Sequence, residues 1–237
     1  MEELKVEGLV INKEEVNEND RIITIFEENR GKIKVLIKGI RKSKNREIYA
    51  SDILVLGDYI LKKKGEYFYN TSLQLKNPFF SIKSNFFKLE LSLYILIVID
   101  KITFENIESK KLYKLVINTL NAIQEEKSKN KILIILSYFF YKILCYEGFK
   151  ISTGNGLFFN LKEGSIQEKV SEEGILLFDY QKEYLKRLIS IDIKGLYELE
   201  LDNNKIISVI SILENFLNYN LFLELNIKKH LGEEKWI

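Results

Sequence analysis

The hydrophobic pattern of this 237-residue chain changes its period once, close to its single proline, Pro78. Before Pro78, apolar and polar side chains alternate in short segments separated by turn residues, which is typical of strands. After Pro78, apolar residues recur every three or four positions, which is typical of helices. The sequence therefore predicts an α+β protein with two domains, residues 1–77 built of strands and residues 78–237 built of helices.

Five short segments of the first domain favour strands. They are residues 4–12, 21–26, 32–40, 53–61 and 67–75. In the third segment Ile33, Val35 and Ile37 alternate with mostly charged positions, and Gly31 before it is free to take a positive φ in a tight turn. Five short strands with tight turns, in about 75 residues, fit a small closed β-barrel of the OB type.

The second domain is expected to be an α-helical bundle. Its helical segments are residues 85–102, 112–123, 131–146, 180–189, 194–199 and 205–225. Ser84 or Asn85 can cap the first of these helices. The segment 131–146 is apolar nearly all round and is expected at the centre of the bundle, with Cys145 as a small buried side chain. Glycine-rich residues 149–176, with short strand-like pieces at residues 156–161 and 174–178, predict an irregular insertion between helices.

Positive charge is concentrated in residues 30–46, which hold eight basic side chains and no acidic one. A local patch of this density suits a polyanion such as a nucleic acid, whereas the plainer interpretation is a solvated surface hairpin. Contacts with phosphates position a nucleic acid without reading its sequence, so no base specificity is expected. The candidate nucleic-acid-binding residues are Arg30, Lys32, Lys34, Lys38, Arg41, Lys42, Lys44 and Arg46.

The composition excludes most of the residue sets on which catalytic sites are built. One cysteine and one histidine exclude an internal disulfide, a thiolate zinc cluster and a multi-histidine metal site. No phosphate-binding GxxxxGK[ST] loop occurs. We therefore expect no catalytic residues, no bound metal and no cofactor. The longest charge-free apolar run, residues 132–141, is too short to cross a bilayer, and the acidic first residues do not form a secretory signal, so a cytoplasmic protein is expected.

Several motifs together resemble one family. Residues 18–26 (ENDRIITIF), 31–33 (GKI) and 38–44 (KGIRKSK) are similar to the N-terminal domain of RecO, the bacterial recombination mediator. That family typically shows E-x-D, a β-branched strand ending in T-x-F, then G-K, then K-G-x-R-R/K-x-K. Residues 216–221 and 228–231 resemble its closing helix and basic ending. The chain departs from the family in lacking the four-cysteine zinc motif in residues 149–176, so zinc is not carried over, and in having Val16 where tyrosine is common.

The resemblance implies an activity as well as a fold. It implies a non-enzymatic protein of recombinational DNA repair that binds single- and double-stranded DNA and anneals complementary strands. It also implies that the protein helps RecA replace SSB, together with RecR. The implied partners are DNA, RecR and the C-terminal tail of SSB, the last on the helical domain. No motif identifies the residues that would contact RecR or SSB.

Two questions stay open in the sequence. A basic barrel face also serves an RNA-binding OB module with a helical protein-interaction domain, and composition does not separate this alternative from a DNA-binding mediator. Tyr67 and Tyr69 share one face of a predicted strand, where their rings could stack on bases as in single-strand binders. For these two tyrosines, burial in the barrel core is the interpretation we favour.

Overall fold

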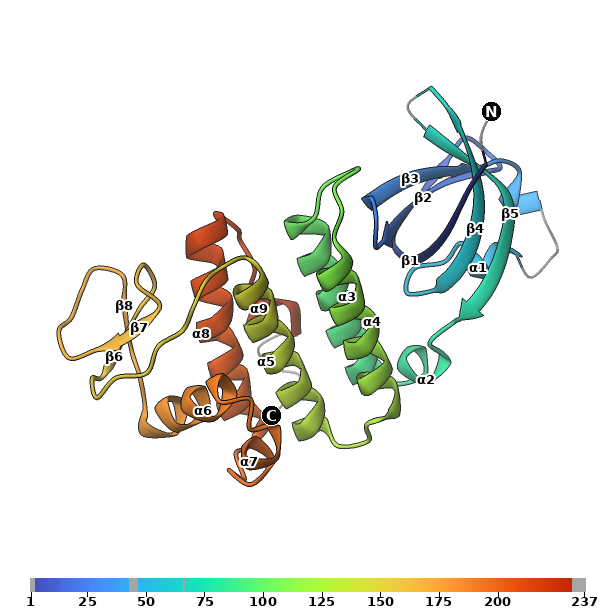
Figure 1. Cartoon of the computed structure of the whole chain (residues 1–237). Coiled ribbons are helices and arrows are strands. Elements are labelled where there is room, and N and C mark those ends of the chain that lie inside the picture. The colour runs from blue at the N-terminus through green and yellow to red at the C-terminus, as the bar shows by residue number, and fades with distance from the viewer. Residues whose placement is uncertain (1–2, 43–46, 66, 232–237) are drawn as a thin grey trace. The chain divides into compact units, whose positions relative to one another are not determined.

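The computed structural model describes residues 3–42, 47–65 and 67–231 of the chain (Figure 1). It contains two compact units, Met1–Ile117 and Asn118–Ile237, which divide within helix α4 (Lys110–Glu125). The change from strands to helices comes earlier, between β5 and helix α2 (Phe80–Lys83). The predicted division into domains 1–77 and 78–237 stays a prediction.

The first unit contains a closed five-stranded barrel with strand order β1-β2-β3-β5-β4. Its strands are β1 (Glu3–Val16), β2 (Asp20–Glu27), β3 (Gly31–Ile37), β4 (Leu56–Lys64) and β5 (Tyr67–Asn77). Strands β3 and β5 run parallel and close the barrel, while the other neighbours are antiparallel. The predicted fold class, an OB-type barrel followed by helices, is confirmed.

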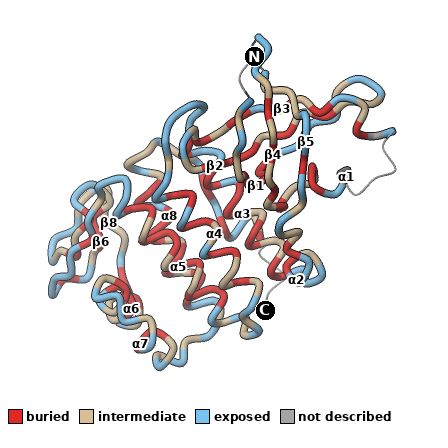
Figure 2. Tube along the Cα trace, turned by 45° about the vertical axis from the view of Figure 1, so that its right-hand side comes forward, coloured by how far each residue is buried: buried red, intermediate tan, exposed pale blue. Residues whose placement is uncertain are grey.

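Alternation along β3 produces this barrel wall. Ile33, Val35 and Ile37 are buried in the barrel core, whereas Lys34 and Lys38 between and after them are exposed. Figure 2 shows buried and exposed stretches along the barrel strands. Gly31 has a φ of +62°, as the turn before the strand requires. One face of β3 therefore stabilises the barrel by burial, and its other face presents lysines to solvent.

Short helical pieces lie within and directly after the barrel. The β3–β4 connection contains the 3-10 turn η1 (Ile40–Lys42) and helix α1 (Glu47–Ala50).

Helix α3 (Phe86–Ile102) begins after Asn85, whose side-chain oxygen accepts a hydrogen bond from the Lys88 amide at 3.1 Å. Asn85, one of the two predicted caps, therefore satisfies one of the free amides at this helix start.

The second unit is mainly helical. Its helices are α5 (Lys129–Tyr146), α6 (Asp179–Ile189), α7 (Ile193–Tyr197), α8 (Asn203–Leu221) and α9 (Ile227–Leu231). Helix α5 packs against α8, as its nearly all-round apolar surface predicts. Two predictions are wrong: Cys145 is exposed, and α8 stops at Phe222, which takes a left-handed φ of 54°. Within the described ranges, no helix is both long and apolar enough to span a membrane.

The predicted insertion forms a small three-stranded sheet of strand order β7-β6-β8. Its strands are β6 (Phe158–Asn160), β7 (Ser165–Gln167) and β8 (Gly174–Leu176). The Asn160 side chain accepts hydrogen bonds from the amides of Lys162 and Glu163 and donates one to Ser171. The ring of Phe159 packs edge-on against Phe216 of α8, 5.4 Å between centroids. Hydrogen bonds and aromatic packing therefore hold this segment in shape.

Candidate nucleic-acid interface

On its side toward β5, strand β3 has backbone partners at its start and again at residues 35–36. At the start of β3, the Lys32 amide donates to the carbonyl of Phe104 at 3.2 Å. Further along, residues 35–36 pair with residues 68–69 of β5. Beyond Leu36 no further pair of β3 and β5 is formed among the described residues, so these two strands separate at this end of the closed barrel, along a line that we call the seam.

The lysines at the start of β3 are held by carboxylates of the same unit. The Lys32 ammonium donates to a carboxylate oxygen of Asp100 at 3.0 Å and to its main-chain carbonyl at 2.6 Å. Lys34 pairs with Glu105 at 2.8 Å, and the hydrogen bond and charge of Glu105 raise the pKa of Lys34. Arg30, half-buried, makes no ion pair with a described residue. Much of the positive charge at this end of β3 is therefore already neutralised.

The basic residues after β3 are differently placed. Lys38 and Lys42 are exposed, and neither makes an ion pair with any residue that the structure describes. Their turn is fixed by Gly39, which has a φ of +68° and donates its amide to a carboxylate oxygen of Asp20 at 2.8 Å. The Arg41 side chain, Lys44 and Arg46 lie outside the described residues. Lys38 and Lys42 are consequently available to an anion.

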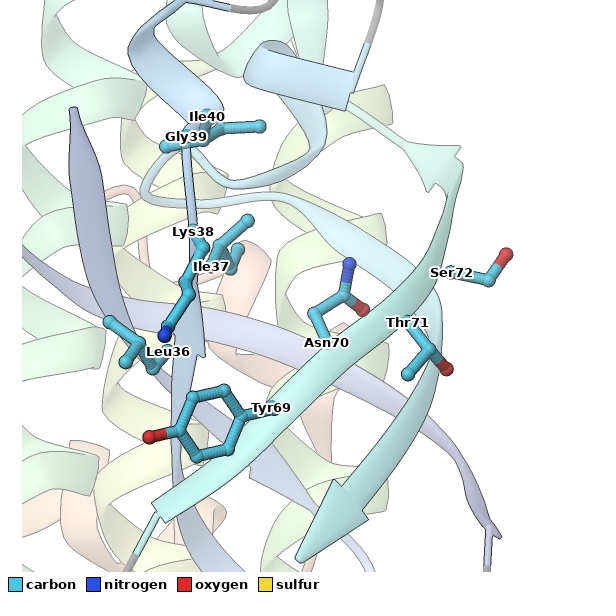
Figure 3. Close-up of a pocket in the computed structure, with 9 residues that line it drawn as sticks. All are labelled: Leu36, Ile37, Lys38, Gly39, Ile40, Tyr69, Asn70, Thr71 and Ser72. Carbon is cyan, nitrogen blue, oxygen red and sulfur yellow. The ribbon is translucent and has the colours of Figure 1, made fainter. Parts of the chain in front are cut away.

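A pocket lies where β3 and β5 separate, and we call it the seam pocket (Figure 3). It has a volume of about 270 Å³ and is lined by residues 36–40 on one side and residues 69–72 on the other. The Lys38 ammonium lies 5.5 Å from the centre of the Tyr69 ring, in cation–π range. The pocket thus combines a cation, an aromatic ring and polar side chains.

Two tyrosines of β5 lie on the outer face of the barrel. Tyr67 is 36% exposed and Tyr69 is half-buried, and neither belongs to the barrel core. The favoured interpretation of both tyrosines as core residues is therefore wrong, whereas Phe68 between them does pack against the core. The reason is the strand period, which sends Tyr67 and Tyr69 to the face opposite Phe68.

Two further cations, which sequence reasoning left out of the site, lie on β4 beside β5. Lys63 and Lys64 are exposed and make no ion pair in the described part of the chain. The Lys63 ammonium lies 6.0 Å from the centre of the Phe68 ring. The run of three lysines at residues 62–64 was visible in the sequence. The pairing of β4 with β5 places Lys63 opposite Phe68 and Lys64 opposite Tyr67.

Two other barrel lysines are paired with carboxylates. Lys62 pairs with Glu3 at 3.2 Å, and Lys76 pairs with Glu7. Burial alone would raise the pKa of Glu7, but hydrogen bonds from Lys76 and Tyr113 lower it below its ordinary value. Several barrel cations outside the seam are thus neutralised within the fold. Lys38 and Lys42, after β3, and Lys63 and Lys64, at the end of β4, make no ion pair with any residue that the structure describes.

Comparison with known proteins places the first 79 residues in one family. Residues 1–79 match the sequence model described as "Recombination protein O N terminal". The DNA repair protein RecO of Clostridium perfringens is 32% identical over 152 residues, 64% of this chain and 61% of that protein. The RecO of Clostridium acetobutylicum is 25% identical over 231 residues, 91% of this chain and 92% of that protein.

Coverage differs among the relatives. The RecO of Acetivibrio thermocellus is 28% identical over 149 residues, which are 63% of this chain and 59% of that protein. Relatives from Thermoanaerobacter and Caldanaerobacter are matched over 54% and 53% of their length. The chain thus spans between half and three fifths of these relatives, and more than nine tenths of the Clostridium acetobutylicum protein.

Proposed function

Because this chain belongs to the RecO family of DNA repair proteins, we propose that it acts in recombinational DNA repair by binding DNA on the outer face of its barrel. It binds single and double strands without sequence specificity and catalyses no covalent reaction. The family match favours DNA over the RNA-binding alternative.

The observation that carries this proposal is that four exposed lysines on and after the barrel strands make no ion pair with any described residue. Lys38 and Lys42 come after β3, and Lys63 and Lys64 lie across β5 on β4. Neutralised phosphates release counterions, which makes binding favourable and dependent on salt. Four such contacts with a single strand correspond to a slope of log affinity against log salt of about −2.8. Contacts by Arg41, Lys44 and Arg46 would steepen the slope further.

The finer activities rest on the family alone. We propose that the protein anneals complementary strands and assists RecA loading with RecR on SSB-coated DNA in the cytoplasm. Annealing is consistent with backbone contacts, because a surface that holds phosphates leaves base edges free to pair. The surfaces for RecR and for the SSB tail are not assigned to residues.

Fluorescence anisotropy tests the proposal directly. A labelled 30-nucleotide single strand, its duplex and an RNA of the same sequence are titrated with protein across a salt series. We expect binding of both DNA forms with a steep salt dependence, and faster annealing of complementary strands when protein is present. Absence of DNA binding at low salt contradicts the proposal, and strong preference for RNA supports the alternative.

A further inference from the structure

The seam pocket has a size that suits one planar group. Its volume of about 270 Å³ is just below the range of about 300–1,000 Å³ that holds a drug-sized ligand. It lies at the edge of the proposed DNA-binding face, next to Lys38.

Tyr69 supplies an aromatic surface at this place. Its ring lies beside β5 with the Lys38 side chain extending toward it from the end of β3 (Figure 3). A lysine stem is flexible, and its ammonium is attracted more strongly to a phosphate than to a neutral ring. When a phosphate binds Lys38, the ring face that Lys38 covers becomes free to stack on a base.

Asn70 supplies an unsatisfied polar atom in the same pocket. Its amide oxygen is buried and accepts no hydrogen bond from any described residue. The side chain lies between β3 and β5 (Figure 3). A buried acceptor without a donor is costly, and most such groups in proteins have a partner. Because this oxygen has no exposed surface, a base contacts it only after the Asn70 side chain turns toward the pocket.

We propose that the seam pocket takes one unpaired nucleobase, which stacks on Tyr69 while Lys38 binds the adjoining phosphate. This inference rests on the proposed function and adds to it a preference for single strands. In a duplex the bases are paired and stacked, so a base enters the pocket only after it is unpaired, at a cost of a few kcal/mol. Tyr69 therefore contributes to binding of single strands and not of duplexes.

The test compares Tyr69→Ala with two controls. Tyr69→Phe keeps the ring, and Tyr67→Ala removes an exposed ring of the same strand that does not line the pocket. Each variant is titrated with a single strand, with a duplex, and with an abasic strand that carries the same phosphates. Urea unfolding of every variant checks that the barrel is intact.

We expect Tyr69→Ala to weaken single-strand binding by about 5- to 150-fold, the effect of losing one stacked base. Duplex binding, abasic-strand binding and the salt slope should not change, because stacking involves no counterion release. Tyr69→Phe and Tyr67→Ala should bind the single strand like the wild type.

The outcomes separate the two proposals. If the wild type binds DNA and Tyr69→Ala binds single strands equally well, the base pocket is wrong and DNA binding stands. An equal loss for single strand, duplex and abasic strand also overturns the base pocket, because it indicates a general effect on the surface. If the wild type binds neither form, both proposals fail.

Discussion

The two ends of β3 carry the same kind of side chain in different surroundings. At the first end, Lys32 and Lys34 meet the carboxylates of Asp100 and Glu105. At the last end, four residues beyond Lys34 and roughly 13 Å along the strand, Lys38 meets an aromatic ring and a pocket. Positive charge in the sequence is therefore not the same as charge available to a ligand, since local pairing decides how much of it remains.

The largest expected effect is the loss of stability when the glycines at the two ends of β3 are replaced by alanine. A Cβ on Gly31 would lie 2.5 Å from the carbonyl oxygen of Ile107, whereas a Cβ on Gly39 would meet nothing within 4 Å. Both have positive φ, so alanine is strained at either position. Urea unfolding should show a loss of about 3 kcal/mol for Gly31→Ala and about 1 kcal/mol for Gly39→Ala. Equal losses would show that the first end is not closely packed.

Single lysine replacements should separate stability from binding. The Lys32 side chain is 17% exposed and donates two hydrogen bonds to Asp100. Lys32→Met should therefore lower the free energy of unfolding by about 1 kcal/mol with little change in DNA affinity. Lys38→Met should lower DNA affinity and leave the free energy of unfolding within about 0.5 kcal/mol of the wild type. Denaturation and anisotropy on the same samples check both, and a lower DNA affinity for Lys32→Met would count against the comparison.

Releasing a paired lysine should have the smallest effect. Glu105→Gln removes the partner of Lys34, an exposed pair whose loss should change stability by less than about 1 kcal/mol. The freed Lys34 can then contact a phosphate, which should steepen the single-strand salt slope by up to about 0.7. A shallower slope in this variant would mean that the pair itself takes part in binding.

The same pair predicts a pH dependence. Because Glu105 raises the pKa of Lys34, the pair stabilises the fold below the ordinary lysine pKa of 10.5. This contribution is lost as the pH rises through the raised pKa. The stability difference between wild type and Glu105→Gln should therefore vanish in strongly alkaline solution, as urea unfolding at pH 8 and above pH 11 can check. A stability difference that persists above pH 11 would have a cause other than the Lys34–Glu105 ion pair.

Much of the fold could be predicted because its determinants are local. Alternation in β3, the turn at Gly31 and the Asn85 cap are set by residues within a few positions of one another. The three-residue strand β7 was missed because so short a segment shows no period. Cys145 was misplaced because an almost wholly apolar helix does not reveal which face stays exposed.

Only part of the candidate site could be predicted, because contacts between residues far apart in the sequence decide which basic side chains stay available to a ligand. Lys32 and Asp100 are 68 positions apart, so the pairing that removes Lys32 from the available charge cannot be seen in sequence. Lys38 and Tyr69 come together only because β3 and β5 are parallel neighbours. The basic segment, residues 30–46, could be located from the sequence. Which of its lysines pair with carboxylates depends on how the barrel closes.

The most direct measurement compares two double variants, Lys38→Gln with Lys42→Gln and Lys32→Gln with Lys34→Gln, in anisotropy titrations of one single strand across salt. Both remove two charges from the same 17-residue segment, residues 30–46. The account predicts that the first pair makes the salt slope shallower by about 1.4 and that the second leaves it nearly unchanged. Equal changes, or a larger change for Lys32 and Lys34, would contradict it.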